Sequence, residues 1–116
     1  MSAPFDSHSY PATIVRHVDA DTTWAHVRLP FDVSINLTFR WAGIDSPERN
    51  TVEGKAALAE VSRLLPLGST CTVTTVKDRR EKFGRYLATF WTADGTNVNA
   101  WLVEAGFAVP YAGGSR

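Results

Sequence analysis

INLTFR (residues 35–40) alternates apolar and polar side chains, which is the pattern of a strand with one buried face. Two β-branched runs precede it, Thr13–Val18 and Thr22–Leu29, and they predict two more strands. The connection at residues 30–34 is expected to be a hairpin turn, although it has no Asn-Gly or Asp-Gly pair. These segments together predict a three-stranded meander.

The hydrophobic period changes in the middle of the chain. Apolar side chains at 57, 61, 64 and 65 predict an amphipathic helix of about three turns that ends at Pro66. Alternation returns in Thr70–Lys77 and Tyr86–Thr92, on either side of a charged loop at Asp78–Arg85. A short helix is predicted for Asn97–Ala105, followed by Gly106 as its C′ residue.

This order of elements predicts a mainly β fold with some α. Five strands, one helix after strand three and a short C-terminal helix match a five-stranded OB-fold barrel. The chain has 116 residues, of which 44% are hydrophobic and 21% charged, and this composition suits one globular domain. We expect the domain to span residues 12–111, with a flexible N-terminal arm at 1–11 and a disordered tail at 112–116.

Charge and targeting signals exclude several classes of protein. Twelve basic and twelve acidic residues cancel, so a polyanion would have to bind a local patch rather than a wholly basic surface. The single cysteine, Cys71, excludes a disulfide framework. There is no transmembrane run and no secretory signal. We expect a monomer without membrane association or an obligate protein partner, and an intracellular one if Met1 is the native start.

The aromatic and histidine residues give weaker signals. The histidines have no zinc-ligand spacing among themselves or with the cysteine. Core packing is the expected role of all the tryptophans, rather than base stacking; they are Trp24, Trp41, Trp91 and Trp101.

Three segments place charged side chains beside the ends of predicted strands. Asp19-Ala20-Asp21-Thr22 puts two carboxylates between the first two strands. A second segment puts Arg40 on a strand and Asp45 and Glu48 just past its end. The third, residues 77–85, holds five basic and two acidic residues. Each also has a purely structural interpretation: an Asx turn, a helix start and a solvated loop.

Taken together, the three segments favour one site. The ends of the first and third strands of a meander can lie at one rim, where Asp21 and Asp45 would repel each other unless a cation lay between them. Carboxylates, a backbone carbonyl and water suit a hard ion such as Ca²⁺. Glu48 is placed to act on a water, and Arg40 and Arg85 to clamp a phosphate. These are the groups needed to hydrolyse a phosphodiester.

The same segments resemble the staphylococcal nuclease (thermonuclease) family. The resemblance extends from about Ala12 to Tyr111 and rests on four motifs. They are Val-Asp-x-Asp-Thr at 18–22, Arg-x₃-Ile-Asp-Ser-Pro-Glu at 40–48, Lys-Phe-Gly-Arg at 82–85, and Asp94-Gly95 followed by Val98-Asn99, Leu102-Val103 and Ala105-Gly106.

The resemblance implies an OB-fold barrel and Ca²⁺-dependent hydrolysis of DNA and RNA that leaves 3′-phosphates. It places the Ca²⁺ ligands on Asp21, Asp45 and the backbone carbonyl of Ser46, with Asp19 close by through water. The general base, or water-orienting carboxylate, falls on Glu48. The phosphate-clamping and substrate-binding side chains implied are Arg40, Arg85, Lys82, Phe83 and Tyr111.

Some positions depart from the family pattern. Ala20 stands where the family usually has glycine, which puts the metal affinity in question. Phe83 stands where tyrosine is frequent, so stacking would survive while a hydroxyl contact would be lost. Ser46 replaces a common threonine or alanine, and Tyr111 is displaced by about one position from the family's tyrosine.

A non-catalytic OB-fold nucleic-acid-binding module is the alternative interpretation. Such a module has no need of Asp21, Asp45 and Glu48, which would repel phosphate without a metal. We therefore expect a calcium-dependent nuclease acting on single-stranded DNA or RNA, with double-stranded DNA as a further candidate substrate.

Overall fold

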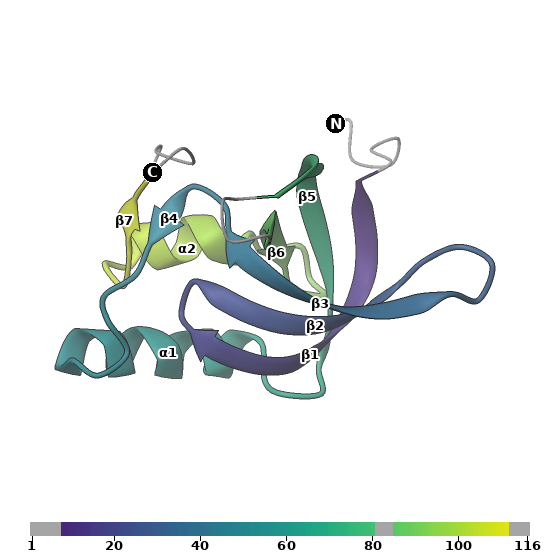
Figure 1. The fold of residues 1–116 in the computed structure, drawn as a ribbon. Coiled ribbons are helices and arrows are strands. Elements are labelled where there is room, and N and C mark those ends of the chain that lie inside the picture. Colours follow the sequence, from purple (N-terminus) through teal and green to yellow (C-terminus); the bar gives the residue numbers. More distant parts are fainter. Residues whose placement is uncertain (1–7, 81–84, 112–116) are drawn as a thin grey trace.

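The structure is a computed structural model that describes residues 8–80 and 85–111. Five strands close a barrel in the order β1-β2-β3-β6-β5, with β3 and β6 parallel and the other neighbours antiparallel (Figure 1). Two helices and a separate two-stranded sheet, β4 with β7, complete the described fold. The elements are β1 (Ser9–Asp19), β2 (Thr22–Arg28), β3 (Ser34–Trp41), β4 (Ile44–Asp45), α1 (Val52–Leu64), β5 (Thr70–Arg80), β6 (Tyr86–Trp91), α2 (Val98–Glu104) and β7 (Val109–Pro110).

The predicted fold class is confirmed. The corrections concern where elements begin and end, and the two short strands β4 and β7, which the sequence analysis did not predict. Residues 9–11, which we predicted as part of a flexible arm, belong to β1 because they pair with Thr72–Thr74 of β5. β5 continues to Arg80, into the predicted charged loop. The remaining predictions for the arm and the tail fall on residues 1–7 and 112–116, outside the described residues.

Aromatic rings fill the barrel. Trp41 stacks on Phe90 with ring centroids 4.4 Å apart, and Phe39 meets Phe90 edge-on at 5.9 Å. All three side chains are fully buried, so the core prediction for Trp41 is confirmed. It is wrong for Trp24 and Trp101, which are 42% and 38% exposed.

The alternation of inward and outward side chains along β2 explains why the core prediction is wrong for Trp24. Thr23, Ala25 and Val27 are buried and face the barrel interior, so the residues between them face outward. Trp24 therefore shares the outer face with His26 and Arg28. Its size suggested burial, but the alternation of the strand decides the side.

Both ends of α1 are tied to the rest of the molecule. At its start Thr51 is the N-cap, and its hydroxyl accepts the N–H of Gly54 at 2.9 Å. The helix begins at Val52, earlier than the apolar pattern from Ala57 predicted, because its first turn exposes Val52 and Glu53 and so carries no core-facing pattern.

A buried chain of hydrogen bonds holds the other end of α1. Trp41 Nε1 donates to Thr23 Oγ1 at 2.9 Å, and this hydroxyl lies 2.9 Å from His17 Nδ1. His17 Nε2 lies 2.8 Å from the carbonyl oxygen of Leu65 and must carry the proton in that bond. Burial lowers the pKa of His17, against a smaller opposite effect of the bond to Leu65. Helix and barrel are thereby fixed relative to each other.

No helix in the described part of the chain is long and apolar enough to cross a membrane.

Candidate active site

Strand pairing brings three of the sequence motifs to one rim of the barrel. Thr22 of β2 pairs with Arg40 of β3, which in turn pairs with Leu87 of β6. Beyond the end of the ladder, the Trp41 N–H donates to the carbonyl of Asp21 at 2.9 Å. Residues that are far apart in sequence therefore meet where these strands end.

Asp21 lies at the centre of this rim and is only 8% exposed. Its Oδ2 accepts the backbone N–H of Ser46 at 3.0 Å, and its Oδ1 accepts the hydroxyl of Thr22 at 3.3 Å. Donors from two separate segments thus orient the carboxylate. The turn after β1 and the loop after β4 are joined through this one side chain.

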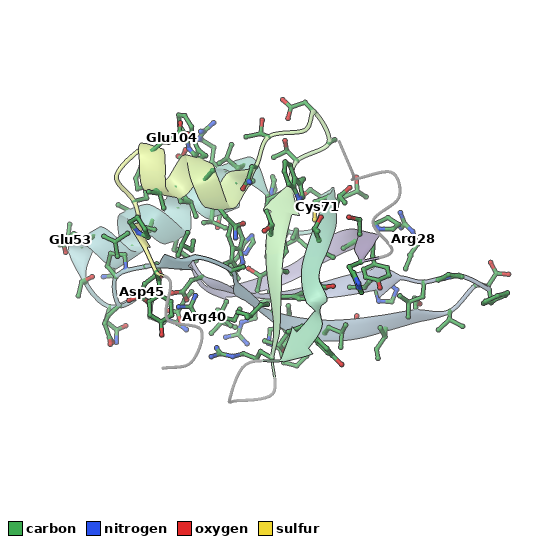
Figure 2. All side chains as sticks on the ribbon, turned by 90° about the horizontal axis from the view of Figure 1, so that it is seen from above. Arg28, Arg40, Asp45, Glu53, Cys71 and Glu104 are labelled. Atoms are coloured by element: carbon green, nitrogen blue, oxygen red, sulfur yellow. The ribbon has the colours of Figure 1, made fainter. Side chains whose placement is uncertain are left out.

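Arg40 bridges the two carboxylates that the sequence singled out. Its Nη1 lies 3.5 Å from Asp21 Oδ2, and its Nη2 donates to Asp45 Oδ1 at 3.3 Å. Figure 2 shows Arg40 and Asp45 side by side at this end of the molecule. The Arg40 guanidinium carbon also lies 5.6 Å from the ring centroid of Tyr111, within cation–π range. The predicted convergence of Asp21 and Asp45 is therefore observed, with Arg40 between them.

Arg85 reaches the same cluster through Thr22. Its Nη1 donates to Thr22 Oγ1 at 3.2 Å, and the same hydroxyl donates to Asp21. Thr22 is 6% exposed and was not among the predicted site residues. The signal for it was present, since Thr22 closes the Val-Asp-x-Asp-Thr motif.

Asp19 and Glu48 add further negative charge. Burial first, and then the charges of Asp21 and Glu48, raise the pKa of Asp19, whereas Arg49 and Arg85 lower it. Asp21 and Glu48 therefore lie close enough to Asp19 to act on its charge. Arg49 does as well, and the sequence analysis had not singled it out.

The backbone of Glu48 is fixed by the start of α1. Its carbonyl accepts the Thr51 N–H at 3.0 Å and the Thr51 hydroxyl at 2.7 Å. Gly54 packs against this carbonyl so closely that a Cβ there would lie 1.8 Å from the Glu48 oxygen. Gly54 thus positions Glu48, a role that sequence reasoning missed because a glycine in a first helical turn has no pattern of its own.

Gly54→Ala is expected to destabilise the protein by about 1–3 kcal/mol, the usual cost of overpacking. At a helix position with free space, the same change would stabilise the protein by up to about 1 kcal/mol. The sign of the change in the free energy of unfolding therefore shows whether Gly54 is crowded. The backbone near Glu48 must move to admit the methyl group. Thermal unfolding of Gly54→Ala beside Ser62→Ala, an exposed position on the same helix, tests this. An unfolding temperature at or above wild type would contradict the close contact.

The carboxylate oxygens at this rim are of the type that a hard divalent cation prefers. Asp21 and Asp45 both contact a single cationic group, the Arg40 guanidinium. Among the described residues no group of three or more His, Cys, Asp or Glu side chains could hold a metal. Backbone carbonyl oxygen and water would therefore have to complete the coordination, as Ca²⁺ accepts.

Of the remaining predicted residues, the structure describes Ser46 and Tyr111. The backbone N–H of Ser46 faces Asp21, and Tyr111 is held near the rim by its N–H bond to the Gly43 carbonyl at 2.8 Å. Lys82 and Phe83 lie outside the described residues.

Comparison with known proteins gives consistent similarities. The family model described as staphylococcal nuclease homologue matches residues 38–115. Two proteins named "Uncharacterized endonuclease", from Escherichia coli O157:H7 and Escherichia coli, are 33% identical over 98 residues, which cover 84% of this chain and 59% of each relative. Endonuclease YhcR of Bacillus subtilis (strain 168) is 29% identical over 119 residues, covering 93% of this chain and 9% of that protein. The chain therefore spans about three fifths of the length of the Escherichia coli relatives.

Proposed function

The chain belongs to the staphylococcal nuclease family, and on that ground we propose that it is a calcium-dependent nuclease. It hydrolyses phosphodiester bonds of DNA or RNA and leaves 3′-phosphate ends. The observation that carries the proposal is the bridge of Arg40 between Asp21 and Asp45, with Arg85 joined to the same cluster through Thr22. The names of the relatives support it, since each is called an endonuclease.

In this proposal Asp21, Asp45 and the backbone carbonyl of Ser46 hold Ca²⁺, with Asp19 reached through water. Bound there, the ion supplies positive charge that polarises the phosphodiester. A site of this kind would also relieve the repulsion among the carboxylates, which adds to burial in raising the pKa of Asp19. Calcium binding should therefore stabilise the fold.

The protein's own side chains accept the proton of the attacking water and stabilise the negative charge on the phosphate. Glu48 takes a proton from a water, whose oxygen forms a bond to phosphorus as the bond from phosphorus to the 5′ oxygen breaks. The 5′ oxygen leaves as a hydroxyl by gaining a proton from solvent water, and Glu48 returns the proton that it took to solvent. Arg40 and Arg85 donate N–H groups to the phosphate oxygens, whose negative charge grows in the pentacoordinate state.

Incubation with single-stranded DNA in Ca²⁺, beside the same mixture with chelator, tests the function. We expect cleavage with Ca²⁺, none with chelator, and much slower cleavage in Mg²⁺, which demands shorter octahedral bonds. Asp21→Ala should weaken Ca²⁺ binding and cleavage together, measured by calorimetric titration and turnover. Asp94→Asn, an exposed aspartate in the turn after β6, is the matched control.

Two outcomes would count against the proposal. Intact DNA in both mixtures, at ample protein and low salt, would leave the non-catalytic binding module as the better interpretation. Faster cleavage in Mg²⁺ than in Ca²⁺ would show that the metal site has the wrong geometry.

A further inference from the structure

Trp24 is a large apolar side chain on the outside of the barrel. It is 42% exposed, while its chain neighbours Thr23 and Ala25 are fully buried. Tryptophan is most often buried in large part, so an outward-facing indole on a regular strand needs a reason beyond core packing. Strand alternation fixes its direction, because Thr23 and Ala25 already occupy the inner face.

The residues opposite Trp24 define what lies beside it. Arg16 of β1 and Thr38 of β3 are its direct cross-strand partners, so their side chains share its face. Arg16 is exposed and Thr38 half-buried. We call these three residues, Arg16, Trp24 and Thr38, the Trp24 face.

The Trp24 face is continuous with the candidate active site. Arg40 follows Thr38 by two positions on β3 and pairs with Thr22, which precedes Trp24 by two positions on β2. Trp24 and Arg40 are therefore diagonal neighbours on one face, a relation that places Cβ atoms roughly 7 Å apart. Thr22 is also the residue to which Arg85 donates.

The charge of this surface suits a polyanion. Arg16 supplies a positive charge, and the next row along the sheet is the pair His26 and Asn36, whose side chains lie 2.7 Å apart and contain no carboxylate. Among the described residues of β1 to β3 that share this face, carboxylates occur only at the active-site end, beginning with Asp19. An exposed aromatic ring flanked by arginine is the combination that binds single-stranded nucleic acid through stacking and backbone charge.

We propose that the Trp24 face is a subsite for a single-stranded polynucleotide. A base stacks on the indole of Trp24, Arg16 contacts a backbone phosphate, and the strand continues toward the phosphate held by Arg40. The placement of that last phosphate rests on the proposed nuclease function. Stacking on Trp24 does not depend on it, since binding needs no hydrolysis.

Trp101 provides a natural comparison. It is exposed to a similar extent, 38%, but its Nε1 donates to Glu60 Oε2 at 2.7 Å, and Glu60 also pairs with Arg63. The indole is thus fixed between the two helices beside a carboxylate that would repel phosphate. We expect no nucleic-acid contact there.

The test is the affinity for a labelled single-stranded oligonucleotide of about 12 nucleotides, a length that spans such a site. Fluorescence anisotropy in chelator at low salt measures binding without cleavage. Trp24→Leu, which keeps apolar bulk, should raise the Kd about 5- to 100-fold, the effect of losing one stacked base. Trp24→Phe should retain most of the affinity, and Trp101→Leu should bind within about 2-fold of wild type, below the effect of one stacked base.

Salt dependence tests the role of Arg16. Arg16→Gln should reduce the slope of log Kd against log salt by about 0.7, the loss of one phosphate contact on a single strand, whereas Trp24→Leu should leave the slope unchanged. The proposal is overturned if Trp24→Leu binds like Trp101→Leu. It is also overturned if the wild-type protein shows no binding at about 0.1 mM, the weak end of non-specific affinity, or if Trp24→Leu changes self-association and not DNA affinity.

Cleavage of a dinucleotide in Ca²⁺ separates this inference from the proposed function. Trp24→Leu should cut the dinucleotide at the wild-type rate while losing kcat/KM on the oligonucleotide. If the wild-type protein cuts neither substrate, the nuclease proposal fails, and the binding measured in chelator still decides the Trp24 face.

Discussion

Glu48→Gln is expected to slow Ca²⁺-dependent cleavage of single-stranded DNA by about 10²- to 10⁴-fold, the range for loss of a general base. The substitution keeps the shape of the side chain but removes its charge and its basic oxygen. Stability should change by less than about 0.5 kcal/mol, because the Glu48 side chain is exposed and Thr51 is bonded to the backbone carbonyl instead. Single-turnover rates and thermal unfolding measure the two effects separately.

Glu53→Gln is the matched control for this prediction. Glu53 is an exposed glutamate in the first turn of α1, so it reproduces the loss of one negative charge at the helix start. A loss of rate shared equally by both variants would mean that Glu48 acts through the general field of the helix terminus. A wild-type rate in Glu48→Gln would remove Glu48 from the mechanism.

Local sequence patterns predicted the barrel strands, the first two from β-branched runs and the other three from alternation. The inner face of β2 is marked by Thr23, Ala25 and Val27, and the outward direction of Trp24 follows from the same pattern. The core prediction for Trp24 was wrong because it relied on the size of the side chain and not on the alternation along the strand. Information present in the sequence was therefore sufficient for this residue.

Other features depend on partners that are distant in the chain. β4 consists only of Ile44 and Asp45, and it exists because these residues pair with Pro110 and Val109. Two-residue strands carry no periodicity, so no local pattern could reveal them. This pairing holds Asp45 beside Arg40, and the adjoining bond from the Tyr111 N–H to the Gly43 carbonyl brings the Tyr111 ring to the same arginine.

The candidate site was predictable as a set of residues but not as a network. The motifs named Asp21, Arg40, Asp45 and Arg85, and strand topology was enough to expect them at one rim. A motif also contained Thr22, but the link that its hydroxyl makes between Arg85 and Asp21 comes from side-chain geometry. Gly54 was likewise hidden, because its role is the space that it leaves for the Glu48 carbonyl.

Arg85→Ala is expected to lower the turnover of single-stranded DNA by about 10²-fold or more, the scale for losing one donor to a transition state. Ca²⁺ affinity should remain nearly unchanged, since Arg85 is not one of the proposed Ca²⁺ ligands and donates to the hydroxyl of Thr22. Loss of the bond to Thr22 should cost about 0.5–1.5 kcal/mol of stability. Arg63→Ala, which removes an exposed arginine from α1, is the control for a general loss of positive charge.

Substitution of Arg85 isolates a catalytic effect from a structural one better than substitution of Arg40 does. Arg40 pairs with both Asp21 and Asp45, so Arg40→Ala would disturb the carboxylates and the phosphate contact at once. Arg85→Lys sharpens the test further, because lysine keeps the charge but loses the planar fork that binds two phosphate oxygens. If charge alone matters, Arg85→Lys should cleave at nearly the wild-type rate. If bidentate contact matters, its rate should lie close to that of Arg85→Ala, and near wild-type turnover in Arg85→Ala itself would exclude the residue from the mechanism.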